Sequence, residues 1–360
     1  MTAQTGVGSP PRPRYAGIDT LRAAAALAVF ICHVPPYGRF AEQMPPMLNN
    51  LFVTGAHGVD VFIVVSGFCL ALPYTKSSRS VDVHSFYKRR AYRIAPPYYV
   101  ALAVASALAI GPGTWHWVVA EQANAGDIAL AAMFLQAWAG VEGTVNGSLW
   151  SVALEVSLYL VFPLLVLWWQ RFSLSSLVVI SGVLAVAWFE APIDGPSMHL
   201  VLPARLVQFA IGMWCAQLIS RRSVSTLVSA SAAFAAVIAG VTLSTLNLLG
   251  PSLLAWGAAG GSLCLLVVTL GERGTVWKLA ERAGQVSYSF YLMHQPVLLV
   301  FFYWFQKTGT SWMISLGIGL TVALAASYVV GLLLYVTVEQ PSAKRSQFIR
   351  PTPAKGNLSP

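Results

Sequence analysis

The sequence predicts an all-α polytopic membrane protein with ten transmembrane helices and both termini in the cytoplasm. The composition points to this class, because 56% of the residues are apolar and only 10% are charged, against roughly 25% charged residues in a soluble domain. The mean hydropathy is +0.66. Apolar runs long enough to cross a bilayer, about 20 residues each, recur along almost the whole chain.

Ten apolar segments are the predicted spans. They cover approximately residues 17–37, 51–74, 94–112, 149–170, 174–190, 200–219, 224–244, 251–271, 284–306 and 311–338. A further apolar segment, 127–139, is too short to cross a bilayer, so we expect an interfacial or re-entrant piece within an outer loop over residues 113–148. We expect the first span to be retained, because it lacks a clear small-residue cleavage site.

The basic residues between the spans give the expected orientation. Lys and Arg concentrate in the cytoplasmic loops of membrane proteins, and with ten spans only Arg39 and Lys307 fall in outer loops. Counting 127–139 as a span would place Arg171 and the Arg221/Arg222 pair on the wrong sides. We therefore expect a cytoplasmic tail (1–16), a membrane domain (17–338) and a basic cytoplasmic tail (339–360) in the cell (inner) membrane.

Several function classes are not indicated. The net charge of +9 comes from short basic clusters between the spans, which membrane topology explains without a nucleic-acid partner. The four cysteines lie in apolar runs without a C-x-x-C spacing, so neither a disulfide framework nor a metal site is predicted. No internal repeat indicates an inverted-repeat transporter.

Ionisable side chains inside the predicted spans are costly and therefore mark candidate functional sites. They are Arg22, His33, Asp60, Glu155, Arg205 and His294. Arg22 and His33 are eleven residues apart, which is three turns plus roughly 20°, so both project from nearly the same helix face about 16 Å apart along the axis. Cys32 projects from another face, which argues against a Cys–His dyad. Pairing with Asp19 is the structural alternative for Arg22.

The second span contains His57 and Asp60, whose i, i+3 spacing allows them to share a face. Its glycines, Gly58 and Gly67, allow a neighbouring helix to approach closely. Glu155 lies about two turns into a later span, and an ion pair with Arg205 is its structural alternative.

His294 lies about two and a half turns into its span and is preceded by Tyr288 and Tyr291. Its structural alternative is a bond to the backbone that Pro296 leaves irregular. The cluster "FYKRRAYR" (86–93) at the inner face is either a topology anchor or a grip for an anionic ligand, since guanidinium groups suit phosphate oxygens.

These stretches, in this order, resemble the membrane-bound acyltransferase-3 family of bacterial integral-membrane O-acyltransferases. The resemblance is carried by "GIDTLRAAAALAVFICH", "GVDVFIVVSGF", "FYKRRAYRIAPPYY", "SLWSVALEVSLYLVFP", "VSYSFYLMHQPV" and "VEQP". Two positions depart from the family pattern: Val156 replaces a frequent second acidic residue, and Gln295 stands where tryptophan commonly follows the late histidine.

The resemblance implies transfer of a short acyl group from cytoplasmic acyl-CoA, as donor substrate without a bound cofactor, to a hydroxyl group. It implies His33 as general base, since an imidazole titrates near neutral pH, with Glu155 or Asp60 orienting it. The arginines expected to bind the phosphates of acyl-CoA are Arg22, Arg89, Arg90 and Arg93. Further candidates are Ser66, Trp150, Ser151, Arg205, Tyr288, Tyr291 and His294, and a covalent acyl-His or acyl-Ser route (Ser66 or Ser151) is the less favoured one.

The acceptor stays open among a surface glycan, a lipid-linked sugar or glycolipid, and a glycosylated small molecule such as an antibiotic. The alternative function is a multi-pass transporter or export protein without acyl-transfer chemistry, in which the ionisable residues would line a translocation path. Cleavage of an acyl-CoA thioester that depends on an added acceptor would separate the two.

Overall fold

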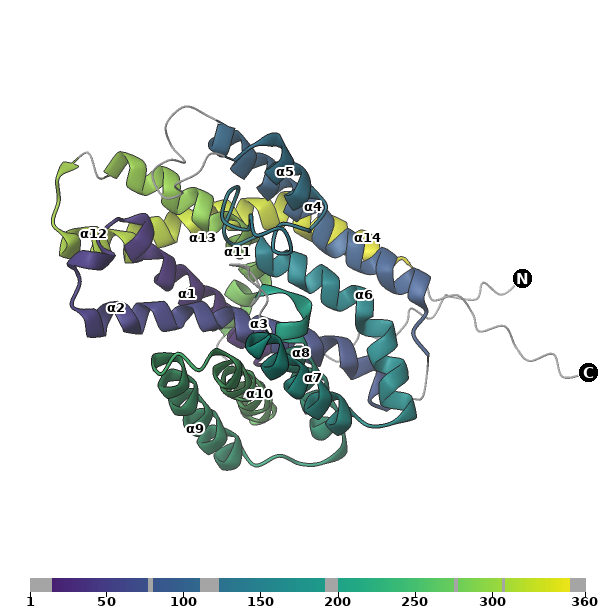
Figure 1. The fold of residues 1–360 in the computed structure, drawn as a ribbon. Helices are drawn as coiled ribbons and strands as arrows, with labels where there is room; N and C mark the ends of the chain where they lie inside the picture. Colours follow the sequence, from purple (N-terminus) through teal and green to yellow (C-terminus); the bar gives the residue numbers. More distant parts are fainter. Residues whose placement is uncertain are drawn as a thin grey trace, which may run out of the picture.

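The computed structural model describes residues 15–76, 80–110, 123–191, 200–274, 278–305 and 308–349. Within these ranges the regular structure is helical, with no strand, which confirms the predicted all-α class (Figure 1). Of the predicted tails, residues 1–14 and 350–360 lie outside the described residues, as do residues 113–122 of the predicted outer loop 113–148.

The described chain contains the following α-helices. They are α1 (Ile18–Tyr37), α2 (Pro46–Val53), α3 (Gly58–Ala71), α4 (Val83–Ile110), α5 (Ala125–Ala132), α6 (Trp150–Arg171), α7 (Leu174–Glu190), α8 (Leu202–Arg221), α9 (Thr226–Thr245), α10 (Leu249–Glu272), α11 (Lys278–Phe305), α12 (Trp312–Ile318), α13 (Leu324–Leu334) and α14 (Gln340–Gln347). Two π-helical turns, Gly319–Ala323 and Tyr335–Glu339, join α12, α13 and α14 into one long element.

Eight segments of the described chain are long and apolar enough to cross a membrane. They contain α1, α2 with α3, α4, α6, α8, α9, α10, and α12 to α14. Two other predicted spans also form helices: α7 is a shorter apolar helix of 17 residues, and α11 has 28 residues but includes the polar sequence His294–Gln295. The protein is therefore a multi-pass membrane protein, and the count of ten stays a prediction.

Segment 127–139 forms only a short helix. Helix α5 has eight residues and ends at Ala132, so it spans about 12 Å at 1.5 Å per residue. The Asn124 side chain accepts from the Asp127 backbone N–H and the Asp127 carboxylate accepts from that of Asn124, which caps the first turn. This length agrees with a segment that does not cross the bilayer.

Helix α4 begins earlier than the predicted third span. It starts at Val83 rather than near residue 94, so the basic cluster and the apolar run form one helix of 28 residues. Arg90 and Arg93 are therefore three residues apart on a single helix and share a face.

Helices α1, α3, α8 and α11 pack together at the centre, while α9 and α10 form a pair at one edge of the bundle (Figure 1). Glycines bring α3 and α8 into direct backbone contact. A Cβ atom at Gly67 would lie 2.1 Å from the Phe209 carbonyl oxygen, and one at Gly212 would lie 2.0 Å from that of Val64. This confirms the predicted packing role of Gly67.

The first turn of α1 is held by a side chain from α11. Glu281 Oε1 accepts hydrogen bonds from the backbone N–H groups of Gly17 (3.1 Å) and Thr20 (2.9 Å) and from the Thr20 hydroxyl (2.7 Å). The first N–H groups of a helix have no partner inside it, and a carboxylate there also suits the helix dipole. Glu281 therefore fixes the end of α1 that carries Arg22.

Candidate active site

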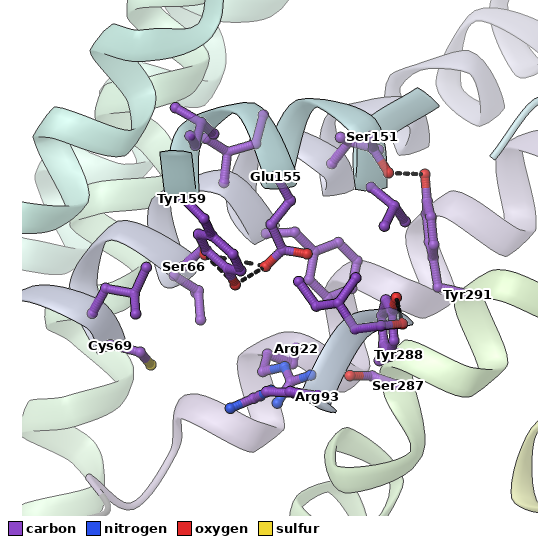
Figure 2. A pocket seen from close by; sticks show the side chains of 18 of the residues that line it. Arg22, Ser66, Cys69, Arg93, Ser151, Glu155, Tyr159, Ser287, Tyr288 and Tyr291 are labelled. Atoms are coloured by element: carbon purple, nitrogen blue, oxygen red, sulfur yellow. Dashed lines mark hydrogen bonds between the residues drawn. The ribbon is translucent and has the colours of Figure 1, made fainter. Parts of the chain in front are cut away.

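A cavity of about 110 Å³ lies between α1, α3, α4, α6 and α11 (Figure 2). Its polar lining residues are Arg22, Ser66, Cys69, Arg90, Arg93, Ser151, Glu155, Tyr159, Ser287, Tyr288 and Tyr291. Apolar side chains, chiefly from α3 and α6, complete the wall. The cavity thus brings together most of the residues that the sequence motifs contribute.

One wall of the cavity carries a carboxylate with two hydroxyl groups. The Ser66 hydroxyl donates to Glu155 Oε1 over 3.2 Å, and the Tyr159 hydroxyl donates to the same oxygen. Helix α6 places Glu155 and Tyr159 four residues apart, on one face. In this arrangement Glu155 joins α3 to α6, and the ion pair with Arg205 considered above is not the one formed.

Two arginines occupy the opposite side of the cavity, and a third lies over Tyr159. Arg22 and Arg93 lie next to each other across the cavity from Glu155 (Figure 2). The Arg90 guanidinium lies over the Tyr159 ring, 5.5 Å from its centroid, within the range of a cation–π contact. Arg22 also donates to Asp19 over 3.5 Å, which confirms the predicted pair. Arg22 therefore pairs with Asp19 and lines the cavity at the same time.

Arg89 is placed differently from the other predicted arginines. It does not line the cavity, and its guanidinium donates to the backbone carbonyl of Ile349 over 3.5 Å. Neighbouring residues on a helix project about 100° apart, so a side chain beside Arg90 faces away from a cavity that Arg90 and Arg93 share.

The far end of the cavity is closed by a hydrogen bond between α6 and α11. The Ser151 hydroxyl donates to the Tyr291 hydroxyl over 2.8 Å. Tyr288, one turn before Tyr291, donates to the backbone carbonyl of Ile94 on α4 over 3.2 Å. Both tyrosines are therefore fixed where they line the cavity.

His33 lies beyond this end and is not among the lining residues. Its Nδ1 atom is 2.7 Å from the Val29 carbonyl oxygen and 3.3 Å from His294 Nε2. His294 Nδ1 in turn lies 2.6 Å from the Tyr291 carbonyl oxygen. Tyr291 therefore stands between the cavity and the histidine pair.

The residue after His294 completes this group. Gln295 Nε2 is 2.9 Å from His33 Nε2, and the Tyr37 hydroxyl donates to Gln295 Oε1 over 3.0 Å. The carbonyl that Pro296 deprives of its helical partner is that of Leu292, and it accepts from the Asn146 amide over 3.3 Å. The expected backbone bond of His294 is therefore made to the neighbouring carbonyl, that of Tyr291, and not to the one freed by Pro296.

Asp60 belongs to a separate buried cluster. It accepts from Arg205, and its Oδ2 lies 2.6 Å from His57 Nδ1, which confirms the predicted shared face of His57 and Asp60. The Trp256 ring stacks on His57 at 3.9 Å, and Trp150 lies 5.7 Å from the Arg205 guanidinium. Asp60 does not contact His33 here, nor does Glu155, because each carboxylate is held by other partners.

Metal ligands are not gathered anywhere in the described ranges, where no three His, Cys, Asp or Glu side chains are arranged to hold an ion. The Cys32 side chain lies close to that of His33, although adjacent residues project from different faces of a helix: Sγ lies 3.5 Å from Nδ1. Its thiol donates to the Val29 carbonyl over 3.1 Å, so both side chains converge on the same backbone oxygen.

The chain matches a family model described as an acyltransferase domain over residues 15–335. It belongs to the acyltransferase-3 family. The acyltransferase MdmB of Streptomyces mycarofaciens is 28% identical, with 92% of each chain covered. The exopolysaccharide production protein ExoZ of Rhizobium meliloti is 28% identical over 84% of this chain and 93% of its own. The O-acetyltransferase OatA of Staphylococcus aureus is 26% identical over 43% of this chain and 25% of its own.

No solved structure matches the chain. Some residues of this acyltransferase that shape the site were not singled out from the sequence. Tyr37 and Cys69 belong to no recognisable sequence motif, and only the folded chain shows which residues they contact. Glu339 accepts from the Ser289 hydroxyl over 2.6 Å, and the "VEQP" motif marked its segment without indicating this partner.

Proposed function

We propose that this acyltransferase moves a short acyl group from acyl-CoA to a hydroxyl group of a sugar-containing acceptor. The observation that carries the proposal is the cavity, which has guanidinium groups on one side and a carboxylate with hydroxyl groups on the other. Family membership supports acyl transfer over transport. The relative ExoZ is named an exopolysaccharide production protein, which favours a carbohydrate acceptor.

The arginine side is the proposed grip for the donor. Arg22, Arg90 and Arg93 line the cavity, and guanidinium groups bind phosphate oxygens through paired hydrogen bonds. In the orientation with ten spans and cytoplasmic termini in the cell membrane, this side faces the cytoplasm, where acyl-CoA is made. The pantetheine arm then extends along the cavity toward Ser151 and Tyr291.

His33 is the proposed general base. Its Nδ1–H is directed at the Val29 carbonyl, which leaves the lone pair on Nε2 to take a proton. The acceptor oxygen attacks the thioester carbonyl carbon as His33 Nε2 takes the hydroxyl proton, and the C–S bond breaks. The proton passes to the departing thiolate, which leaves as CoA with a free thiol, and the acceptor leaves as an ester.

In this scheme the thioester passes the Ser151–Tyr291 hydrogen bond to reach His33. Glu155 acts inside the cavity instead of orienting the imidazole. It holds the Ser66 and Tyr159 hydroxyls and offsets the positive charge of the arginines opposite. Asp60 acts on the structure of α3 and α8 through Arg205.

Loss of the imidazole tests the proposal. His33→Ala is expected to lower CoA release from acetyl-CoA in isolated membranes by at least about 100-fold, the usual contribution of a general base. His84→Ala is the matched control, since His84 is exposed at the beginning of α4. Full turnover by His33→Ala at normal protein level would falsify the role of His33.

A further inference from the structure

The side-chain amide of Gln295 contacts the nitrogen of His33 that takes a proton in the proposed reaction. Gln295 Nε2 lies 2.9 Å from His33 Nε2, which is the nitrogen that takes the acceptor proton. Gln295 is 2% exposed, whereas His33 is only partly buried, so Gln295 is the side chain that covers this nitrogen from the protein interior.

The neighbouring groups fix the direction of each hydrogen bond. The Tyr37 hydroxyl donates to Gln295 Oε1 over 3.0 Å, which leaves the amide Nε2 as a donor toward His33. The Val29 carbonyl accepts only, so His33 Nδ1 carries the hydrogen and Nε2 accepts. The amide N–H of Gln295 thus stands where the O–H of an acceptor must stand.

We propose that Gln295 is a positioning residue that covers the proton-accepting nitrogen of His33 until an acceptor hydroxyl displaces it. This inference rests on the proposed function. Without this cover, water would reach Nε2 in place of an acceptor hydroxyl, and water also attacks a thioester. By filling this position with its own N–H, Gln295 couples thioester cleavage to the presence of an acceptor.

The packing around the amide supports a covering role. A Cβ atom at Gly147 would lie 3.1 Å from Gln295 Oε1, so the loop before α6 lies directly against the amide. The same loop is tied to α11 by the bond from Asn146 to the Leu292 carbonyl.

The side reaction that Gln295 suppresses is hydrolysis of the donor. Water attacks the thioester carbonyl carbon, His33 Nε2 takes one of its protons, and the C–S bond breaks. The products are the free carboxylic acid and CoA, with the proton returned to the thiolate. The diagnostic quantity is the ratio of free acid to acylated acceptor.

The test uses acetyl-CoA labelled in the acetyl group and membranes that contain the full-length protein. Without added acceptor, Gln295→Ala is expected to release free acetate at least about tenfold faster than the natural protein. Gln208→Ala is the matched control, because Gln208 is a fully buried glutamine on α8 whose amide donates to the Leu253 carbonyl over 3.3 Å. It should leave the acetate rate unchanged.

Tyr37→Phe is the second variant, and it serves alone if Gln295→Ala fails to accumulate. It removes the donor that anchors Gln295 Oε1, so a smaller rise in acetate release is expected. Unchanged acetate release in both variants overturns the inference if His33→Ala still abolishes CoA release. Normal CoA release by His33→Ala overturns the proposed function instead, so the two failures are distinguishable.

Discussion

Ser66 on α3 donates a hydrogen bond to Glu155 on α6 over 3.2 Å. This contact crosses the cavity wall and, together with the Tyr159 hydroxyl on the same carboxylate oxygen, holds a negative charge opposite Arg22 and Arg93. The two motifs that contribute Ser66 and Glu155 are 89 residues apart in the chain, and the cavity makes them a single unit.

Replacement of Glu155 by glutamine should therefore impair acyl transfer. The amide keeps the shape but loses the charge, and hydrogen bonds to a charged group are worth about 1.5–3 kcal/mol. We expect transfer to fall about 10- to 100-fold, measured as acylated product at equal protein level. Tyr159→Phe removes one hydroxyl and keeps the carboxylate, so its loss should be smaller. A Glu155→Gln enzyme with natural activity would contradict the assigned role.

The arginines that line the cavity should control donor binding. Arg93→Gln and Arg22→Gln are each expected to raise KM for acyl-CoA about tenfold, with less change in kcat, because each removes a charge-assisted contact to phosphate. The measurement is initial rate against acyl-CoA concentration at fixed salt. Arg89→Gln is the matched control, since Arg89 bonds the Ile349 carbonyl outside the cavity. An equal rise in KM for all three variants would argue against a specific grip.

Cys69 offers a direct test of the cavity and of its orientation. This exposed thiol lines the cavity together with the arginines, whereas Cys215 and Cys264 are buried. A membrane-impermeant maleimide should modify it in inside-out vesicles and not in right-side-out vesicles, and CoA should slow the modification. Cys69→Ser gives the background from the other thiols. Modification from the opposite side only would reverse the predicted orientation.

Asp60 and Arg205 should be essential to stability. Both are buried, at 2% and 8% exposure, and removing one partner of a buried pair costs about 3–5 kcal/mol. We expect Asp60→Asn to lower the melting temperature of the detergent-purified protein markedly. The double variant Asp60→Asn/Arg205→Gln should recover part of the loss, since it leaves no unpaired charge. Additive losses in the double variant would show that the two side chains do not interact.

Close packing of α3 on α8 gives a further stability prediction. Gly67→Ala should destabilise the protein by about 1–3 kcal/mol or more, the usual cost of overpacking, because the added methyl group would overlap the Phe209 backbone. Gly317→Ala is the control, since a Cβ atom there meets nothing within 4 Å. Thermal unfolding in detergent measures both. Equal melting temperatures would show that the helices separate without cost.

The helices and several of the contacts could be predicted from the sequence, because apolar length and i, i+3 spacing act locally. The apolar runs predicted the helices, and the His57–Asp60 and Arg22–Asp19 pairs follow from neighbours on one helix. The partners of Glu155 could not be predicted in the same way. Several hydroxyls and one arginine were available to it, and only the packing of α3 against α6 selects Ser66.

The neighbours of His33 were equally beyond local patterns. Helix geometry predicts that Arg22 and His33 share a face and how far apart they lie. It does not predict that Tyr291 lies between the cavity and the imidazole. Gln295 was visible only as a departure from the family pattern. Gln295 and His33 are 262 residues apart in the chain. Their contact depends on α1 and α11 packing side by side.

The Asp60–Arg205 pair also constrains how the protein is made. The two residues are 145 positions apart, and at about 5–20 residues per second the ribosome needs roughly 7 to 30 s to pass from one to the other. Helix α3 therefore enters the membrane before its cation exists. His57, three residues earlier on the same chain segment, is already synthesised and is within hydrogen-bond reach of Asp60 in the folded protein. Until α8 is made, the partner available to the Asp60 carboxylate is therefore His57, and Arg205 becomes available when α8 packs against α3.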